Sequence, residues 1–187
     1  MPGCNLVLIG SSTGGLKVLE ELFNRLPVLK SAVIIIQHIT PVVDKSFVTS
    51  LARVSKMPVS LAKESTQIQP GQVYLAPGGV HLTLIRNSVV HLHDGEKVNS
   101  VRPSIDVAMK SVSASLGGKI VGVILTGMGN DGAVGISHIK QLGGITIAQD
   151  QKTSVIYGMP KAAAETRQID FILPTERIAD KIKELFG

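Results

Sequence analysis

The chain has 187 residues, of which 44% are hydrophobic and none is tryptophan. This length is typical of one domain, long enough to bury roughly 70% of the unfolded chain's surface, and the composition excludes a disordered protein. Nineteen Lys and Arg against fourteen Asp and Glu give a net charge of +5, which favours an acidic partner. Because no Lys/Arg block occurs and aromatic residues make up only 3%, we do not expect a nucleic-acid partner.

The cysteine count and the N-terminal residues narrow the cellular setting. Cys4 is the single cysteine, which excludes an internal disulfide. The first ten residues lack the basic and apolar regions of a signal peptide, and no apolar run approaches the roughly 20 residues of a membrane-spanning helix. We therefore expect a soluble, cytoplasmic protein without membrane insertion, built as a single domain over residues 1–187.

Hydrophobic spacing predicts alternating strands and helices. The run AVIII at 32–36 is continuous and mostly β-branched, which is typical of a strand covered on both faces. In chain order we predict a strand at 5–9, a helix at 15–26, a strand at 32–36, a helix at 44–54, strands at 59–62 and 72–75, a hairpin of 81–85 and 89–93 around Arg86-Asn87-Ser88, a helix at 103–116, a strand at 120–125, a helix at 133–142, a strand at 145–148, a helix at 160–166, a strand at 171–173 and a helix at 176–186. This order predicts an α/β fold with a doubly wound, mainly parallel sheet flanked by helices and an antiparallel hairpin insertion.

Polar side chains follow three of the predicted strands. Ser12 lies in a glycine-rich turn after the first strand, His38 follows the second, and Asp131 lies in the loop 126–132 after the strand at 120–125. In open parallel sheets, ligands bind outside the carboxyl ends of the strands, so these side chains share one edge of the predicted sheet. A hydroxyl, an imidazole and a carboxylate are the groups of a Ser/His/Asp hydrolase.

The turn Gly10–Gly15 matches one of three known patterns of glycine-rich turns between a strand and a helix. It departs from G-x-G-x-x-G because Ser12 takes the place of the middle glycine, and from the P-loop because Leu16 stands where the lysine is required. It matches G-x-S-x-G with Ser12 at the centre, the pattern of a nucleophile elbow whose serine projects at a helix N-terminus. A plain tight turn is the alternative. Ser11, one residue from the centre, is the weaker nucleophile candidate.

Each remaining candidate has a structural alternative. His38 is either a base or a hydrogen-bonded structural residue, and Asp131 either orients the imidazole or caps the helix that follows it. His81, at the start of the hairpin, either lines the site or packs beside it. Arg102 either binds an anionic group of the substrate or caps the helix region.

Other histidines give no metal site. His91 and His93 share one strand face, but no third ligand is evident, so we expect an exposed strand and no bound metal. His138 is expected to pack or to lie on the surface of its helix.

Six ordered segments show that the chain resembles the catalytic domain of the chemotaxis protein-glutamate methylesterases, the CheB family. They cover nearly the whole chain: IGSSTGG (9–15), IIIQH (34–38), GQVYLAPGGVHL (71–82), RPSIDV (102–107), VILTGMGNDGAVG (123–135) and AQDQKTSVIYGMPKAA (148–163).

The resemblance implies a reaction and a set of residues. Such enzymes hydrolyse the γ-methyl esters of glutamyl residues on the cytoplasmic helices of chemoreceptors, and many also deamidate receptor glutamines. The family's triad falls on Ser12, His38 and Asp131. Thr13 matches a supporting position, and Met128 matches a position whose backbone N–H is implied as an oxyanion donor. No cofactor is implied, and the implied partner is a methylated chemoreceptor.

The sequence departs from the family pattern in two places. Members often begin with a receiver domain, whereas the first strand here starts within five residues of Met1, so we expect that switch to be absent from this chain. The family's QHMP is replaced by QHITP at 37–41, which alters a substrate loop. Two other functions remain open: a phosphate- or nucleotide-binding module that uses the turn Gly10–Gly15, and a non-catalytic receptor-binding homologue.

Overall fold

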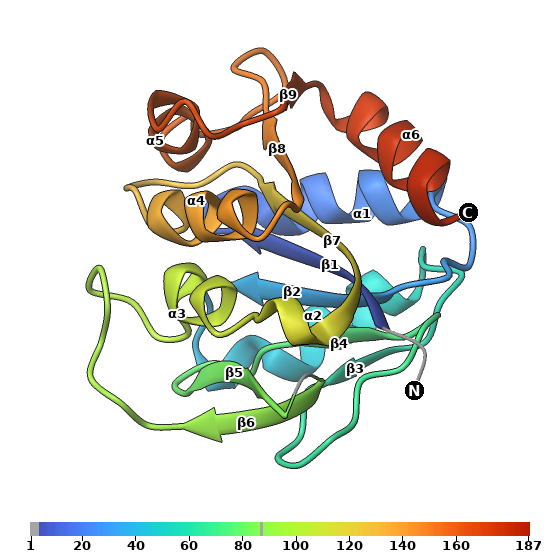
Figure 1. Cartoon of the computed structure of the whole chain (residues 1–187). Coiled ribbons are helices and arrows are strands. Elements are labelled where there is room, and N and C mark those ends of the chain that lie inside the picture. Colours follow the sequence, from blue (N-terminus) through green and yellow to red (C-terminus); the bar gives the residue numbers. More distant parts are fainter. Residues whose placement is uncertain (1–3, 87) are drawn as a thin grey trace.

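The structure, a computed structural model, describes residues 4–86 and 88–187, and Asn87 of the hairpin turn lies outside them (Figure 1). The strands of the main sheet are β1 (Cys4–Ser11), β2 (Ala32–Gln37), β3 (Val59–Leu61), β4 (Val73–Leu75), β7 (Gly117–Ile124), β8 (Ile145–Gln149) and β9 (Phe171–Leu173). Strands β5 (His81–Ile85) and β6 (Val89–His93) form a separate antiparallel hairpin. The helices are α1 (Gly15–Arg25), α2 (Asp44–Ala52), α3 (Ile105–Lys110), α4 (Ala133–Gln141), α5 (Met159–Glu165) and α6 (Thr175–Phe186), with 3₁₀ turns η1 (Pro41–Val43) and η2 (Ala114–Leu116).

The main sheet is parallel throughout. Within the described residues its seven strands take the order β3-β4-β2-β1-β7-β8-β9, which confirms the predicted fold class. β1 is central, with β2 on one side and β7 on the other, so the strand order reverses at β1. Such a reversal opens a crevice at the carboxyl ends of the strands, where ligands bind in folds of this type.

Helices cover both faces of the sheet (Figure 1). Leu6 and Leu8 of β1 pack with α3, α4, α5 and the hairpin, whereas Val7 and Ile9 pack with α1, α2 and α6. All four side chains are fully buried. Because both faces of β1 are covered in this way, its side chains form a continuous apolar run, as is usual for a central parallel strand. Among the described residues, no helix is long and apolar enough to cross a membrane.

The helix predicted at 103–116 is shorter than expected. α3 ends at Lys110, and a separate 3₁₀ turn follows at Ala114–Leu116. The hydroxyl of Ser111 donates to Ala108 O at 2.7 Å and accepts from Leu84 N at 2.9 Å, while the Ser113 hydroxyl accepts from Ser115 N. Serine side chains that bond to the local backbone compete with helix continuation, which the hydrophobic spacing does not reveal.

The close approach of β1 to α3 gives a stability prediction. A Cβ added at Gly10 would lie 2.7 Å from two side-chain carbons of Ile105, so Gly10→Ala should overpack this contact and cost about 1–3 kcal/mol of unfolding free energy. In an Ile105→Ala background the added methyl enters vacated space, and the same change should cost less. Urea unfolding of the four proteins checks this, and equal costs in both backgrounds would contradict it.

Candidate active site

The turn after β1 is a sharp junction between strand and helix. β1 ends at Ser11, Gly14 has a left-handed φ of 80°, and α1 begins at Gly15. Ser12 is half-buried, and its N–H donates to Thr126 O, beyond the end of β7, at 2.9 Å. A Cβ at Gly127 would lie 2.7 Å from the Ser12 Cβ, so the loop after β7 can approach the serine only because residue 127 is glycine.

Ser11 has a structural place. Its side chain is fully buried, and its hydroxyl donates to Gln37 Oε1 at 2.6 Å. The Gln37 amide in turn donates to Ser12 O at 2.9 Å, which joins the end of β1 to the end of β2. Ser11 is therefore unavailable as a nucleophile, and its hydroxyl helps to fix the turn that presents Ser12.

His38 lies beside the serine turn. Its backbone N–H donates to Ser11 O at 3.1 Å, and its ring Nε2 donates to Asp131 Oδ2 at 2.8 Å. The imidazole is 11% exposed and the carboxylate only 3%. Since Nε2 is used by Asp131, Nδ1 is the ring nitrogen left for the serine. Within the described residues, the Ser12 hydroxyl has no hydrogen-bond partner; in unliganded enzymes this contact is often long.

Asp131 is surrounded by donors from other segments. Besides His38, four groups donate to its carboxylate: Ile105 N at 2.6 Å, Ser104 Oγ at 2.8 Å, Asn99 Nδ2 at 2.9 Å and Asp106 N at 3.3 Å. Burial alone would raise the pKa of Asp131, but the bonds from His38, Ile105, Asn99 and Ser104 together hold this pKa below its ordinary value. The carboxylate is thus ionised, oriented and placed against the imidazole.

Asp131 does not cap the helix that follows it. Gly132 is the N-cap of α4, whereas the Asp131 carboxylate receives the first N–H groups of α3. Conversely, Asp106 of α3 accepts from Gly132 N at 3.0 Å and Gly135 N at 2.7 Å at the start of α4. The two helices therefore exchange capping carboxylates, an arrangement that sequence spacing did not reveal.

Two backbone N–H groups of the elbow and of the loop after β7 are without a partner in the part of the chain that the structure describes. These are the N–H groups of Thr13 and Met128. Thr126, fully buried between them, donates its hydroxyl to Thr13 O at 3.0 Å and also lies 3.2 Å from Ile156 O. The elbow and the loop after β7 are joined at this residue. Thr13 and Met128 are both exposed residues.

His81 and Arg102 support the neighbouring loop. His81 is fully buried; its Nδ1 accepts from Ser104 N at 3.2 Å, so its Nε2 carries the proton and donates to Glu96 O at 2.8 Å. Because its side chain is fully buried, His81 has no exposed surface that a substrate could contact. Arg102 donates to Asp94 O at 2.6 Å and Gly95 O at 2.7 Å.

The other histidines lie on β6 of the hairpin and on α4, and none follows a strand of the main sheet. His91 bonds to Glu64 at 3.1 Å and stacks on His93, and His138 bonds to Val112 O at 2.8 Å. The described residues contain no group of three or more His, Cys, Asp or Glu placed to hold a metal ion.

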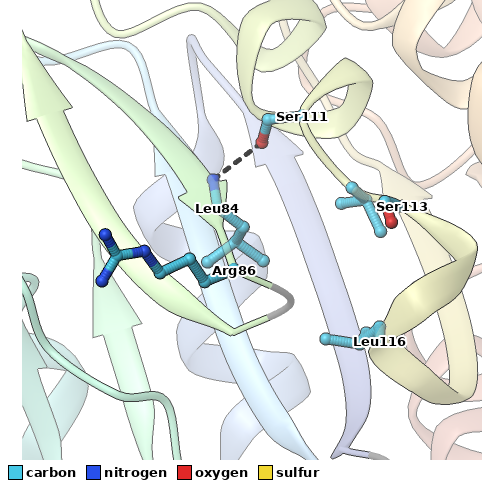
Figure 2. A pocket seen from close by; sticks show the side chains of 6 residues that line it. Leu84, Arg86, Ser111, Ser113 and Leu116 are labelled. Carbon is cyan, nitrogen blue, oxygen red and sulfur yellow. Dashed lines mark hydrogen bonds between the residues drawn. The ribbon is translucent and has the colours of Figure 1, made fainter.

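A cavity of about 160 Å³ lies against the hairpin of β5 and β6 (Figure 2). Its lining residues are Leu84, Arg86, Ser111, Val112, Ser113 and Leu116. None of these is a candidate from the strand ends, and the Leu84 N–H is already bonded to the Ser111 hydroxyl.

The lowered pKa of Asp131 predicts a pH-dependent stability. A depressed pKa contributes stability that is present above the unfolded value, about 3.9, and is lost as the pH falls through the folded value. Asp131→Asn should therefore lower the unfolding free energy by about 1–3 kcal/mol near pH 7. The difference from wild type should shrink as the pH falls from 5 to 3 in chemical unfolding. A constant difference over this range would contradict the prediction.

The comparisons with known proteins identify the family of the chain. The family model described as CheB methylesterase matches residues 7–182. A protein-glutamate methylesterase/protein-glutamine glutaminase from Pyrococcus horikoshii is 41% identical over 186 residues, which are 97% of this chain and 50% of that protein. One from Archaeoglobus fulgidus is 44% identical over 180 residues, 94% of this chain and 52% of that protein.

A solved structure covers the same region. The CheB methylesterase catalytic domain of Thermotoga maritima matches with a TM-score of 0.92 and 36% identity, over 99% of both chains. The chain spans about half the length of the curated relatives it matches. By sequence and by fold, the chain belongs to the CheB methylesterase family.

Proposed function

We propose that the chain hydrolyses γ-methyl esters of glutamyl side chains on the cytoplasmic helices of chemoreceptors and releases methanol in chemotaxis adaptation. The observation that carries the proposal is the His38–Asp131 hydrogen bond of 2.8 Å, placed beside the serine elbow by the pairing of β1 with β2. Ser12 is the nucleophile, His38 the base, and Asp131 the group that orients and stabilises the imidazole.

The first half of the reaction forms an acyl-enzyme. The Ser12 Oγ attacks the ester carbonyl carbon while His38 Nδ1 takes the hydroxyl proton. We assign stabilisation of the developing oxyanion to the N–H groups of Thr13 and Met128, which are left without partners among the described residues and so can donate to it. The bond to the methoxy oxygen then breaks, and His38 returns its proton to this oxygen, so that methanol leaves.

The second half regenerates the enzyme. Water attacks the ester that joins the substrate's glutamyl carbonyl to Ser12, and His38 accepts a proton from the water. When the bond to the Ser12 oxygen breaks, the proton returns to the serine, and a glutamic acid side chain is released. The same sequence with ammonia as the leaving group would deamidate glutamine, the second activity in the name of the relatives.

The partner follows from the relatives and from charge. The relatives are named for action on protein glutamate and glutamine side chains. The net charge of +5 suits an acidic protein surface, which electrostatic attraction would bring to the site. We expect the chain to act in the cytoplasm, where such receptor helices lie.

The phosphate-binding alternative has less support. It uses only the turn Gly10–Gly15 and gives no role to the buried His38–Asp131 pair. In a non-catalytic homologue the Asp131 carboxylate would still cap α3, but its hydrogen bond to the His38 imidazole would have no role in a reaction. The variants below separate both alternatives from the hydrolase.

Replacing the nucleophile tests the proposal directly. Ser12→Ala should lower methanol release from methylated receptor membranes by about 10³-fold or more, because the acyl-enzyme cannot form. Ser11→Ala is the comparison variant: it removes the bond to Gln37 that helps to fix the turn but leaves the Ser12 hydroxyl in place, so its loss of activity should be much smaller. Equal rates for Ser12→Ala and wild type would overturn the assignment.

The oxyanion donor can be removed without changing a reacting side chain. Met128→Pro deletes the backbone N–H and should lower kcat about 10²–10³-fold. Met128→Ala keeps the N–H and should stay near wild type, because the Met128 side chain is 71% exposed. Stopped assays of methanol release, with thermal unfolding as the check on folding, compare the two variants. Similar losses in both would indicate that the side chain matters and the N–H does not.

A further inference from the structure

One side chain outside the triad contacts both buried carboxylates of the site. Asn99 Nδ2 lies 2.9 Å from Asp131 Oδ1 and 2.9 Å from Asp106 Oδ2. The amide group has two N–H donors, so each carboxylate receives one. Asp131 is 3% exposed and Asp106 6%, so two carboxylates lie within hydrogen-bond reach of one nitrogen in a water-poor environment.

We propose that Asn99 is a positioning residue of the triad, which keeps Asp131 ionised and turned toward His38 while a second carboxylate lies next to it. The inference rests on the proposed hydrolase function. Like charges at close range favour protonation of one partner, as in paired carboxylates generally. The Asn99 amide places positive hydrogen atoms between the two groups, and its bond is among those that lower the pKa of Asp131.

Hydrogen bonds to its backbone hold the loop that carries Asn99 in place. Glu96 O accepts from the buried His81 ring, and Arg102 donates to Asp94 O and Gly95 O. Val98 and Val101 exchange backbone hydrogen bonds of 3.2 and 3.1 Å around the turn. These contacts give His81 and Arg102 a role: they hold the segment that delivers the amide to Asp131.

The turn itself suits asparagine. Asn99 has a φ of 53° and Ser100 a φ of 65°, both in the left-handed region, which asparagine adopts more readily than most residues. Because the residue is exposed, replacing it should leave the core intact. Ser100 therefore offers a matched control, since glycine at either position keeps the left-handed φ without a side chain but only one change removes the amide.

The first experiment compares Asn99→Gly with Ser100→Gly in methanol release from methylated receptor membranes. Asn99→Gly should lower kcat about tenfold or more with little change in KM, because a hydrogen bond to a charged group is lost at Asp131. Ser100→Gly should stay within about twofold of wild type. An Asn99→Gly rate within twofold of wild type, or equal losses in both variants, would overturn the proposal.

A second variant tests the charge argument. Asn99→Asp places a third acid beside Asp131 and Asp106. The other charged or titratable groups nearby are His38, which bonds to Asp131, and Lys110, which lines the same hollow as Asp106. When the new acid takes up a proton it again donates a hydrogen bond, so activity relative to Asn99→Gly should rise as the pH falls from 8 to 5. A ratio independent of pH would overturn the charge argument.

A readout without substrate separates this inference from the proposed function. The proton between His38 Nε2 and Asp131 should give a downfield ¹H NMR signal in the free protein, assigned by its absence in Asp131→Asn. Asn99→Gly should shift or broaden this signal and Ser100→Gly should not. If Ser12→Ala hydrolyses the ester as fast as wild type, the proposed function fails whatever the signal does. If Ser12→Ala is inactive and the signal is unchanged in Asn99→Gly, the positioning role fails alone.

Discussion

Helices α3 and α4 each begin at a carboxylate that the other helix's segment supplies. The first N–H groups of a helix have no partner within it, and a buried carboxylate is stable only when donors surround it. Asp131 and Asp106 meet both needs at once, since each accepts from the opposite helix's first turn. The Asp131 carboxylate, the acid of the proposed triad, is thereby fixed by the packing of α3 against α4, and its ionised state is part of how the two helices start.

A second set of polar side chains holds the elbow and base. Ser11, Gln37, Thr126 and Gln149 are buried at the carboxyl ends of neighbouring strands or directly after them. Gln149 accepts from Thr126 N at 2.8 Å and donates to Thr153 O at 2.9 Å, which extends the connection to the loop after β8. Such side chains take over hydrogen bonding where the sheet ladder stops, so the loops that carry the site leave the sheet in defined directions.

The local features of the site could be predicted from sequence, and the features that join distant segments could not. The strand alternation, the G-x-S-x-G turn and the positions of Ser12, His38 and Asp131 after strands are readable because each depends on a short window. The Asp131–Asp106 exchange joins residues 25 apart in the chain through two helix starts, and spacing alone gives no sign of it. A serine and an aspartate flank the first residue of α3, and this pairing in RPSIDV was the available signal. Asn99 stands in an exposed turn without periodicity, so only the folded structure brings it to the carboxylates.

The orientation of the His38 ring and the pairing of β1 with β2 together determine how Ser12 and His38 are placed. Nε2 faces Asp131, so the nitrogen nearest the histidine's own backbone is the one left for the serine. Ser12 and His38 each come one residue after the paired positions Ser11 and Gln37 of adjacent strands. Adjacent strands are about 4.8 Å apart, and this spacing hardly varies. The separation of Ser12 and His38, the proposed nucleophile and base, therefore depends first on the pairing of β1 with β2 and not on the length of the surrounding loops.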